Sequence, residues 1–190
     1  MCIGLYFGSF NPIHHGHLII ANHILNDSYI QKIWFVVSPQ NPFKTSTSLL
    51  NEYDRLHLVN LAIEEDDRLK AVDVEFHLPK PSYTSVTLAY LQEKHPAHQF
   101  SIIMGSDSFQ NIERWNNYQS IIENYQIIIY QRPGFEIYNK EAAKIEIMKA
   151  PLLDISATHI REIIKAGKSI RYLVPENVEN EIEKSRFFKS

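Results

Sequence analysis

Three of the chain's nine histidines, His14, His15 and His17, lie within GSFNPIHHGH, the stretch from Gly8 to His17. Apolar runs flank this stretch, which predicts a loop between a strand and a helix. If the helix begins near His14, the side chains of His14 and His17 leave one face of its first turn. Together with backbone N–H groups at the helix N-terminus, two imidazoles could bind phosphate oxygens and stabilise developing charge.

Metal ligation and a purely structural role are the alternatives for this histidine pair. A zinc site takes about three or four protein ligands, which disfavours a metal. Gly8 would permit close backbone approach or a positive φ, although the loop matches neither the dinucleotide fingerprint nor the P-loop. We interpret His15 and His23 as structural.

Short apolar strands alternate with helical segments from end to end of the chain. This alternation predicts an α/β fold, a doubly wound, mostly parallel sheet with helices on both faces, in one domain. The pattern also predicts a strand-like segment over residues 70–78 and an amphipathic helix over 51–66. The expected apolar stripe of that helix is Tyr53, Leu56, Val59 and Ile63.

Polar or glycine-containing segments follow the predicted strands, and ligands of such sheets bind at the carboxyl ends of the strands. These segments are GSFNP, SPQNPFK, PSYT, GSD and QRPG.

Composition limits the partners of the chain. Its 190 residues carry a formal net charge of -3, so no broad basic surface predicts a nucleic-acid partner. No apolar stretch approaches the ~20 residues of a membrane span, and the N-terminal segment lacks the features of a signal peptide. A single cysteine, Cys2, excludes an internal disulfide and fits a reducing cytoplasm.

Two motifs carry a resemblance to a known family. GSFNPIHHGH resembles the nucleotidyltransferase signature G-[ST]-F-D-P-x-H-x-G-H, and ISATHIR, from Ile155 to Arg161, resembles I-S-S-T-x-I-R. SPQNPFK, PSYT, MGSDSFQNIERW and QRPG are similar, in order and spacing, to segments of the bacterial nicotinate-mononucleotide adenylyltransferases. The resemblance covers essentially the whole chain. Asn11 replaces the family's usual aspartate, and Ala157 replaces a frequent serine.

The resemblance implies a Rossmann-like fold of the nucleotidyltransferase type. It implies one nucleotidyltransferase domain over residues 1–190, with the second motif in a C-terminal helical part, about 156–190. The implied reaction transfers the adenylyl group of ATP to nicotinate mononucleotide, giving nicotinate adenine dinucleotide and pyrophosphate, in NAD biosynthesis. The attacking phosphate is already an anion, so this chemistry needs positioning and charge stabilisation rather than a general base.

The resemblance also implies partners and site residues. ATP and nicotinate mononucleotide are the partners, Mg²⁺ is bound mainly through the ATP phosphates without a protein metal ligand, the location is cytoplasmic, and a homo-oligomer is left open. The implied catalytic residues are His14, His17 and Arg161. The other implied ATP-binding residues are Gly8, Ser9, Phe10, Lys44, Gly105, Asp107, Ser156 and Thr158. The implied mononucleotide-binding residues are Lys44, Tyr83, Thr84, Asp107, Trp115 and Arg132.

Several alternatives stay open at the level of the residues. Helix capping would explain Asp107, Ser156 and Thr158, a core position would explain Trp115, and a solvated loop would explain Lys44. Nicotinamide mononucleotide and phosphopantetheine are alternative acceptors, although PSYT and the GSD…W segment disfavour the second. A catalytically inactive nucleotide-binding regulator and a redox or metal protein are alternatives of other classes.

Overall fold

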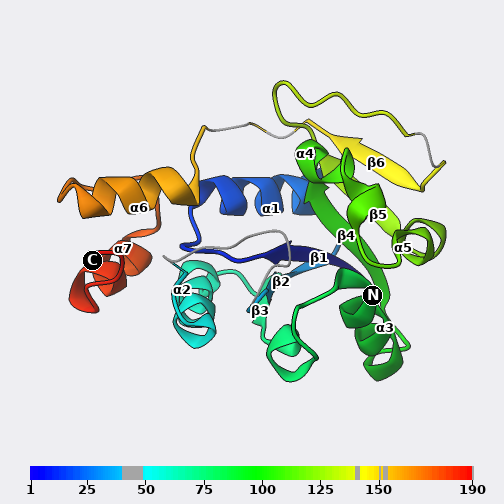
Figure 1. The fold of residues 1–190 in the computed structure, drawn as a ribbon, viewed down its shortest axis with the longest axis horizontal. Coiled ribbons are helices and arrows are strands. Elements are labelled where there is room, and N and C mark those ends of the chain that lie inside the picture. Colours follow the sequence, from blue (N-terminus) through cyan, green and yellow to red (C-terminus); the bar gives the residue numbers. More distant parts are fainter. Residues whose placement is uncertain (40–48, 140–141, 150, 152–153, 190) are drawn as a thin grey trace.

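The computed structural model describes residues 1–39, 49–139, 142–149, 151 and 154–189. A six-stranded sheet in the order β3-β2-β1-β4-β5-β6 forms its centre, and every neighbouring pair of strands is parallel (Figure 1). The strands are β1 (Cys2–Gly8), β2 (Lys32–Val37), β3 (Leu69–Val72), β4 (Gln99–Gly105), β5 (Gln126–Tyr130) and β6 (Ile145–Met148). The predicted parallel α/β sheet is therefore confirmed.

Helices cover both faces of the sheet. One apolar cluster joins the sheet to α1 and α2, and a second, on the other face, joins it to α3 and α5. The helices are α1 (His15–Asp27), α2 (Glu52–Ile63), α3 (Thr84–Lys94), α4 (Ser106–Phe109), α5 (Tyr118–Asn124), α6 (Ala157–Lys165) and α7 (Glu176–Lys184), with 3-10 turns η1 (Val74–His77) and η2 (Ile112–Arg114).

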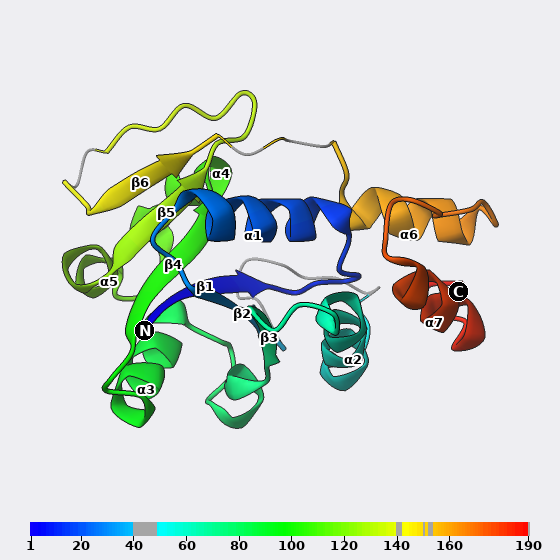
Figure 2. The same ribbon diagram turned by 180° about the vertical axis from the view of Figure 1, so that it is seen from behind.

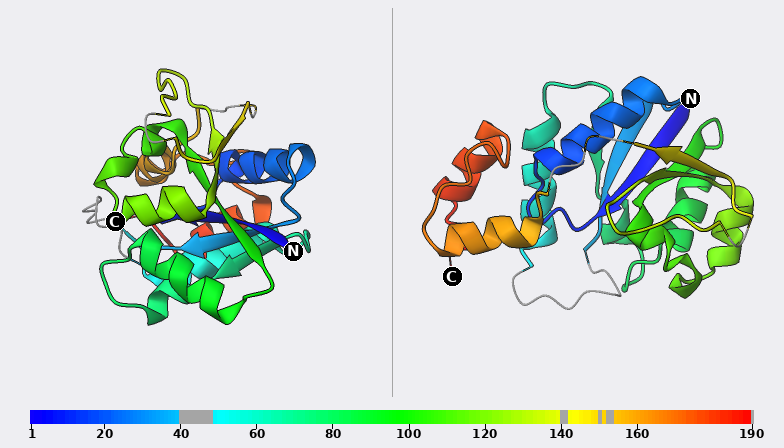
Figure 3. Two further views of the ribbon diagram at one scale, coloured as in Figure 1. Left: turned by 90° about the vertical axis from the view of Figure 1, so that its right-hand side faces the viewer. Right: turned by 90° about the horizontal axis from the view of Figure 1, so that it is seen from above.

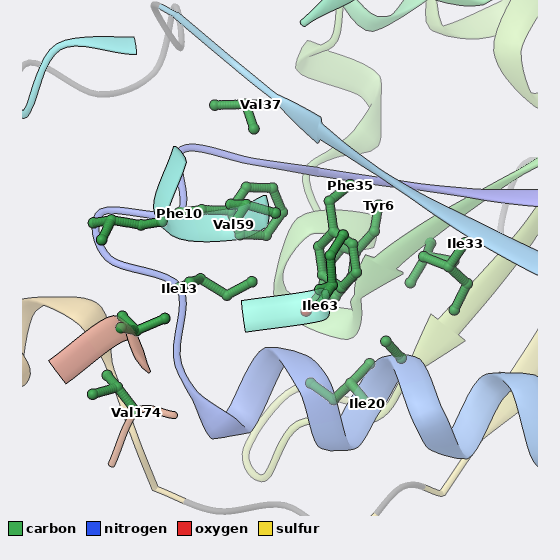
Figure 4. Packing of buried hydrophobic residues seen from close by; sticks show 14 of the residues in the cluster. Tyr6, Phe10, Ile13, Ile20, Ile33, Phe35, Val37, Val59, Ile63 and Val174 are labelled. Atoms are coloured by element: carbon green, nitrogen blue, oxygen red, sulfur yellow. The ribbon is translucent and has the colours of Figure 1, made fainter. Parts of the chain in front are cut away.

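Alternate residues of the central strands point to opposite faces, as the pleat of a strand requires. Leu5 of β1 packs on the α3 side, whereas its neighbour Tyr6 packs on the α1 side. Ile102 and Ile103 of β4 divide in the same way. Because both faces are covered, these strands are nearly continuous apolar runs in the sequence. Figure 4 shows the α1 side, where Tyr6 lies against Phe35.

The C-terminal helices lie outside the layers of the sheet. Figure 2 shows α6 next to the first turn of α1, and Figure 3 shows α6 and α7 extending away from the sheet. The N–H of His15 donates to the carbonyl oxygen of Leu173 at 2.9 Å, which ties this C-terminal part to the start of α1. The second sequence motif is thereby brought to the carboxyl end of β1. No helix within the described ranges is long and apolar enough to cross a membrane.

The strand-like prediction over residues 70–78 is wrong beyond Val72, where β3 ends and η1 follows. Apolar residues alternate through this segment, but Glu75 turns inward and is almost fully buried. The Thr87 hydroxyl donates to Glu75 Oε1 at 2.9 Å, so a polar interaction fixes the turn where the apolar pattern suggested a strand.

The core accounts for the stability of the sheet. Replacing Ile102, fully buried on β4, by alanine should lower the free energy of unfolding by about 2–5 kcal/mol, because it leaves a cavity. The same substitution at Ile147, 48% exposed on β6, should cost no more than about 1 kcal/mol. Urea denaturation of both variants measures the difference, and equal losses would contradict this placement of the core.

Candidate active site

The first turn of α1 brings His14 and His17 together, as their spacing predicted. His14 precedes the helix with an extended backbone (φ -152°, ψ 168°), and its N–H donates to Nδ1 of His17 at 3.3 Å. The two imidazole rings lie face to face with centroids 3.7 Å apart and planes tilted by 30°. The pair is therefore built by the backbone of the helix start, which sets both rings on one face.

The hydrogen bond to His17 also selects its tautomer. Nδ1 accepts, so in the neutral ring the proton resides on Nε2, which becomes the donor. Edge-to-face contacts with Phe10 and Tyr6, at centroid distances of 5.1 and 6.0 Å, hold the ring plane. His17 thus presents one N–H in a fixed direction.

His14 is held neutral by its surroundings. The side chain is 6% exposed, and Nδ1 is buried without a hydrogen-bond partner among the described residues. Burial, with the nearby positive charges of Arg132 and His15, lowers the pKa of His14 from 6.5 to about 4. Of the two forms considered from the sequence, imidazole or imidazolium, this environment selects imidazole at neutral pH.

The structure corrects the reason for Gly8. We expected a positive φ or close backbone approach there, but the positive φ (45°) belongs to Phe10. A Cβ on Gly8 would lie 2.8 Å from the ring of Phe10, which is 2% exposed and packs on Tyr6 and Phe35. Gly8 therefore makes room for the ring that anchors the loop in the core, beside Val59 in Figure 4.

Arg161 joins the two sequence motifs by binding Asn11, which precedes it by 150 residues. Its guanidinium donates to the carbonyl oxygen of Asn11 at 2.8 Å and to Thr158 Oγ1 at 3.2 Å. The side-chain oxygen of Asn11 accepts from the N–H of Leu50 at 3.2 Å, and Asn11 is buried. An amide oxygen makes this bond without burying a charge, which is a physical account of asparagine at this position.

Arg55 is a site residue that the sequence reasoning missed. It is fully buried, and within the described part of the chain its guanidinium donates to backbone carbonyl oxygens. These acceptors are Ser9 at 2.6 Å, Ser38 at 2.8 Å, Leu50 at 2.9 Å and Pro39 at 3.3 Å.

The expected apolar stripe of α2 is correspondingly corrected. The helix buries Arg55, Leu58, Val59 and Ile63, whereas Tyr53 is 59% exposed. Residues 55, 59 and 63 share a face at four-residue spacing, and this was the signal that could have found the arginine. Arginine is rarely buried without a charged partner, so the apolar pattern alone does not place Arg55 on the buried face.

A second polar cluster follows β4 and β5. The Arg132 guanidinium pairs with Asp107 Oδ2 at 3.2 Å and donates to the Tyr130 hydroxyl at 3.1 Å. A Cβ on Gly105 would overlap the Asp107 carboxylate, so glycine is needed for close approach there. The hydroxyls of Tyr130 and Tyr6 lie 3.4 Å apart, which links this cluster to the histidine loop.

The remaining predicted residues occupy two other places. Tyr83 and Thr84 form the start of α3, and Ser85 Oγ donates to Asn116 Oδ1 at 3.3 Å, next to Trp115. Trp115 packs against the cluster on the α3 side of the sheet, opposite to the histidines.

Ser156 caps α6, where its Oγ accepts from the N–H of His159 at 3.2 Å. Lys44 lies outside the described residues. Within the described ranges, no group of three or more His, Cys, Asp or Glu side chains could hold a metal ion.

Comparisons with known proteins agree on one family. The family model for cytidylyltransferase-like proteins matches residues 5–163. A probable nicotinate-nucleotide adenylyltransferase from Flavobacterium psychrophilum is 50% identical, and one from Cytophaga hutchinsonii is 46% identical, each alignment covering 100% of both chains. The nicotinic acid mononucleotide adenylyltransferase of Plasmodium falciparum, solved in complex with NaAD, has a similar fold. Its TM-score is 0.84 at 23% identity, covering 98% of this chain and 97% of that one.

The neutral, buried state of His14 predicts a pH dependence of stability. As the pH falls from 6.5 toward 4, His14 becomes protonated in the unfolded chain, whereas in the folded chain its lowered pKa keeps it neutral. The free energy of unfolding should fall by up to about 3 kcal/mol from this residue, and none of this loss occurs above pH 7.

Urea unfolding of the wild type and of His14→Gln at several pH values measures this contribution. The variant should lose less stability than the wild type between pH 7 and 4, whereas His159→Gln, at an exposed position on α6, should behave as the wild type. Equal pH slopes for His14→Gln and the wild type would contradict the assignment.

Proposed function

We propose a function from one premise: the chain belongs to the cytidylyltransferase-like family, in its branch of nicotinate-nucleotide adenylyltransferases. The protein is a nucleotidyltransferase, and it transfers the adenylyl group of ATP to nicotinate mononucleotide, releasing pyrophosphate and forming nicotinate adenine dinucleotide for NAD biosynthesis. The observation that carries this proposal is the imidazole pair of a neutral His14 and His17, beside a loop whose Ser9 and Asn11 carbonyl oxygens are bound by arginines.

The reaction proceeds by direct displacement. A phosphate oxygen of the mononucleotide attacks the α-phosphorus of ATP, one P–O bond forms, and the bond to the pyrophosphate group breaks. Since the attacking oxygen already carries negative charge, no proton has to be removed and no covalent intermediate on the protein is needed. The site has to bring anions together and stabilise their charge, for which fixed N–H donors are suited.

The histidine loop supplies donors to the ATP phosphates in this proposal. His17 offers the Nε2–H that its tautomer fixes, and neutral His14 offers a hydrogen bond without a buried charge. The backbone of Gly8, Ser9 and Phe10 completes this part of the site. In a trans peptide the N–H of Phe10 points opposite to the Ser9 carbonyl, hence away from Arg55.

The α6 segment supplies the remaining phosphate contacts. Arg161 keeps further N–H donors besides those bound to Asn11 and Thr158, and these are assigned to the β- and γ-phosphates. Ser156 and Thr158 lie at the helix start, where hydroxyl and N–H groups together favour phosphate. Lys44 is proposed as a second cation.

The mononucleotide is assigned to the groups after β4 and β5 and at the start of α3. Arg132, held by Asp107, receives its phosphate, and Asp107 and Gly105 border the ribose. Trp115 offers an apolar ring to the pyridine. Tyr83 and Thr84 offer the N–H groups of the α3 start to the nicotinate carboxylate.

We expect Mg²⁺ to bind together with ATP, where it would neutralise part of the phosphate charge. Phosphate oxygens would supply most of its ligands, because Mg²⁺ is usually held by one or two carboxylates together with the substrate phosphates. Asp107 would contribute the protein oxygen: its Oδ1 is buried and has no hydrogen-bond partner among the described residues, and carboxylates suit this hard cation.

We expect the protein to act in the cytoplasm on two small molecules, ATP and nicotinate mononucleotide. We expect no nucleic-acid or membrane partner. A homo-oligomer stays a prediction.

The reaction is tested by incubating the protein with ATP, Mg²⁺ and one acceptor at a time. With nicotinate mononucleotide we expect pyrophosphate release and a dinucleotide product of the corresponding mass, faster than with nicotinamide mononucleotide or phosphopantetheine. The absence of product with nicotinate mononucleotide, or a preference for another acceptor, would overturn the substrate assignment.

Replacing His17 by alanine should lower kcat by about a hundredfold or more, because a fixed donor to the reacting phosphates is lost. The free energy of unfolding should change by no more than about 2 kcal/mol, since one hydrogen bond and ring contacts are removed. Steady-state kinetics and urea denaturation measure the two effects, with His159→Ala on α6 as the exposed control. A kcat for His17→Ala equal to that of the wild type would exclude a catalytic role.

A further inference from the structure

We propose that Arg55 is a positioning residue of the adenylyl-transfer site, which aligns the loop that holds the ATP phosphates without touching the nucleotide. This inference rests on the proposed function. Arg55 is fully buried, so it acts through the backbone atoms to which it donates.

The placement of its acceptors is the first argument. Ser9 follows β1 and Ser38 follows β2, and these neighbouring strands pair in register up to Gly8 and Val37. The N–H of Ser38 donates to the Gly8 carbonyl at 2.9 Å, so the sheet itself continues to this point. Beyond this point, hydrogen bonds from the Arg55 guanidinium connect the two strand ends to each other and to the segment before α2.

The direction of the bonds is the second argument. A carbonyl oxygen facing a phosphate would repel it, whereas an N–H group attracts it. Arg55 binds the Ser9 carbonyl at 2.6 Å, and Arg161 binds the Asn11 carbonyl at 2.8 Å from another part of the chain. Both carbonyls are thus turned toward protein cations. The Phe10 N–H, opposite to the Ser9 carbonyl across a trans peptide, is turned the other way.

The cost of burial is the third argument. A guanidinium without water is expensive, and an apolar side chain in its place is often neutral or stabilising for a fold. Arg55 forms no ion pair with any carboxylate of the described residues, and burial lowers its pKa to about 10, so it is charged at neutral pH. Among the described residues its hydrogen bonds go to carbonyl oxygens, and the more distant carboxylate of Glu52 favours its charged form. Its positive charge lies against the Ser9 carbonyl of the loop, where the anionic substrate is proposed to bind.

The same guanidinium also binds two residues that are well separated in the sequence. Pro39 and Leu50 flank residues 40–48, and the carbonyls of both accept from Arg55 at 3.3 and 2.9 Å. Leu50 in addition donates to the Asn11 side chain. One buried group thus sets the geometry at the carboxyl ends of β1 and β2 together.

Arg55→Lys is the sharpest test, because it keeps the charge and removes the planar fork. A single ammonium cannot reach acceptors spread over three segments, so the loop should lose its alignment. We expect kcat to fall at least tenfold and the KM for ATP to rise, while the KM for nicotinate mononucleotide changes less than twofold. Arg68→Lys is the matched control: Arg68 is bound to Asp66 at the surface and should keep wild-type kinetics.

Arg55→Met separates positioning from stability. If Arg55 were only an anchor of the fold, the folded fraction of this variant would turn over at the wild-type rate. We expect the fully folded variant, checked by circular dichroism at the assay temperature, to lose kcat at least as much as Arg55→Lys. Calorimetric titration with ATP and Mg²⁺ should show weakened ATP binding in both variants, a readout that does not depend on the acceptor.

Arg55→Ala provides a rescue experiment that holds even if the other variants fold poorly. The substitution leaves space for a guanidinium ion, and millimolar guanidinium should restore part of kcat where sodium at equal ionic strength does not. An active wild type with unchanged kcat and ATP affinity in Arg55→Lys, or with no rescue of Arg55→Ala, would overturn the positioning role. A wild type that is inactive with nicotinate mononucleotide but whose ATP affinity depends on Arg55 would instead overturn the proposed reaction and leave the role of Arg55 standing.

Discussion

The loop between β1 and α1 depends on cations that take up its carbonyl oxygens. Arg55, which is buried in the core, binds the Ser9 carbonyl, and Arg161 of the C-terminal part binds the Asn11 carbonyl. In a short loop that faces anions, the carbonyl oxygens have to be hydrogen-bonded and turned away from the phosphates. Buried carbonyl oxygens need donors, and exposed ones would repel phosphate. The arrangement of α2 and α6 around this loop follows from that requirement, since each helix carries one of the arginines.

The histidine pair raises a second question of charge, namely how two close imidazoles avoid repelling each other. Two imidazoles with centroids 3.7 Å apart would repel one another if both were charged, and burial lowers the pKa of His14 to about 4. Arg132 adds to this lowering from the other side of the site. His14 thus adds no positive charge of its own beside the arginines, and it serves as a directional hydrogen-bonding group. This division of roles suits a reaction whose attacking group is already an anion.

Much of the fold could be predicted from the sequence, because strands buried on both faces are apolar runs and the helices between them are periodic. The same pattern failed after Val72, where a buried Glu75 rather than apolar alternation decides the backbone. In the site, the spacing of His14 and His17 predicted their shared face. The purpose of Gly8 could not be predicted, since it depends on where the Phe10 ring packs. The spacing of residues 55, 59 and 63 could place Arg55 on the buried face, but not its acceptors, because these are backbone atoms of distant segments.

In the proposed function, the loop after β1 presents N–H groups to the phosphates of ATP while arginines hold its carbonyl oxygens. The most direct measurement is the nuclear magnetic resonance titration of ¹⁵N-labelled protein with ATP and Mg²⁺ in the absence of the acceptor. The amide signals of Phe10 and of the first turn of α1 should move furthest, and that of Phe10 should shift downfield because its N–H gains an anionic acceptor. Saturating ATP binding that leaves these amides unmoved would contradict the account.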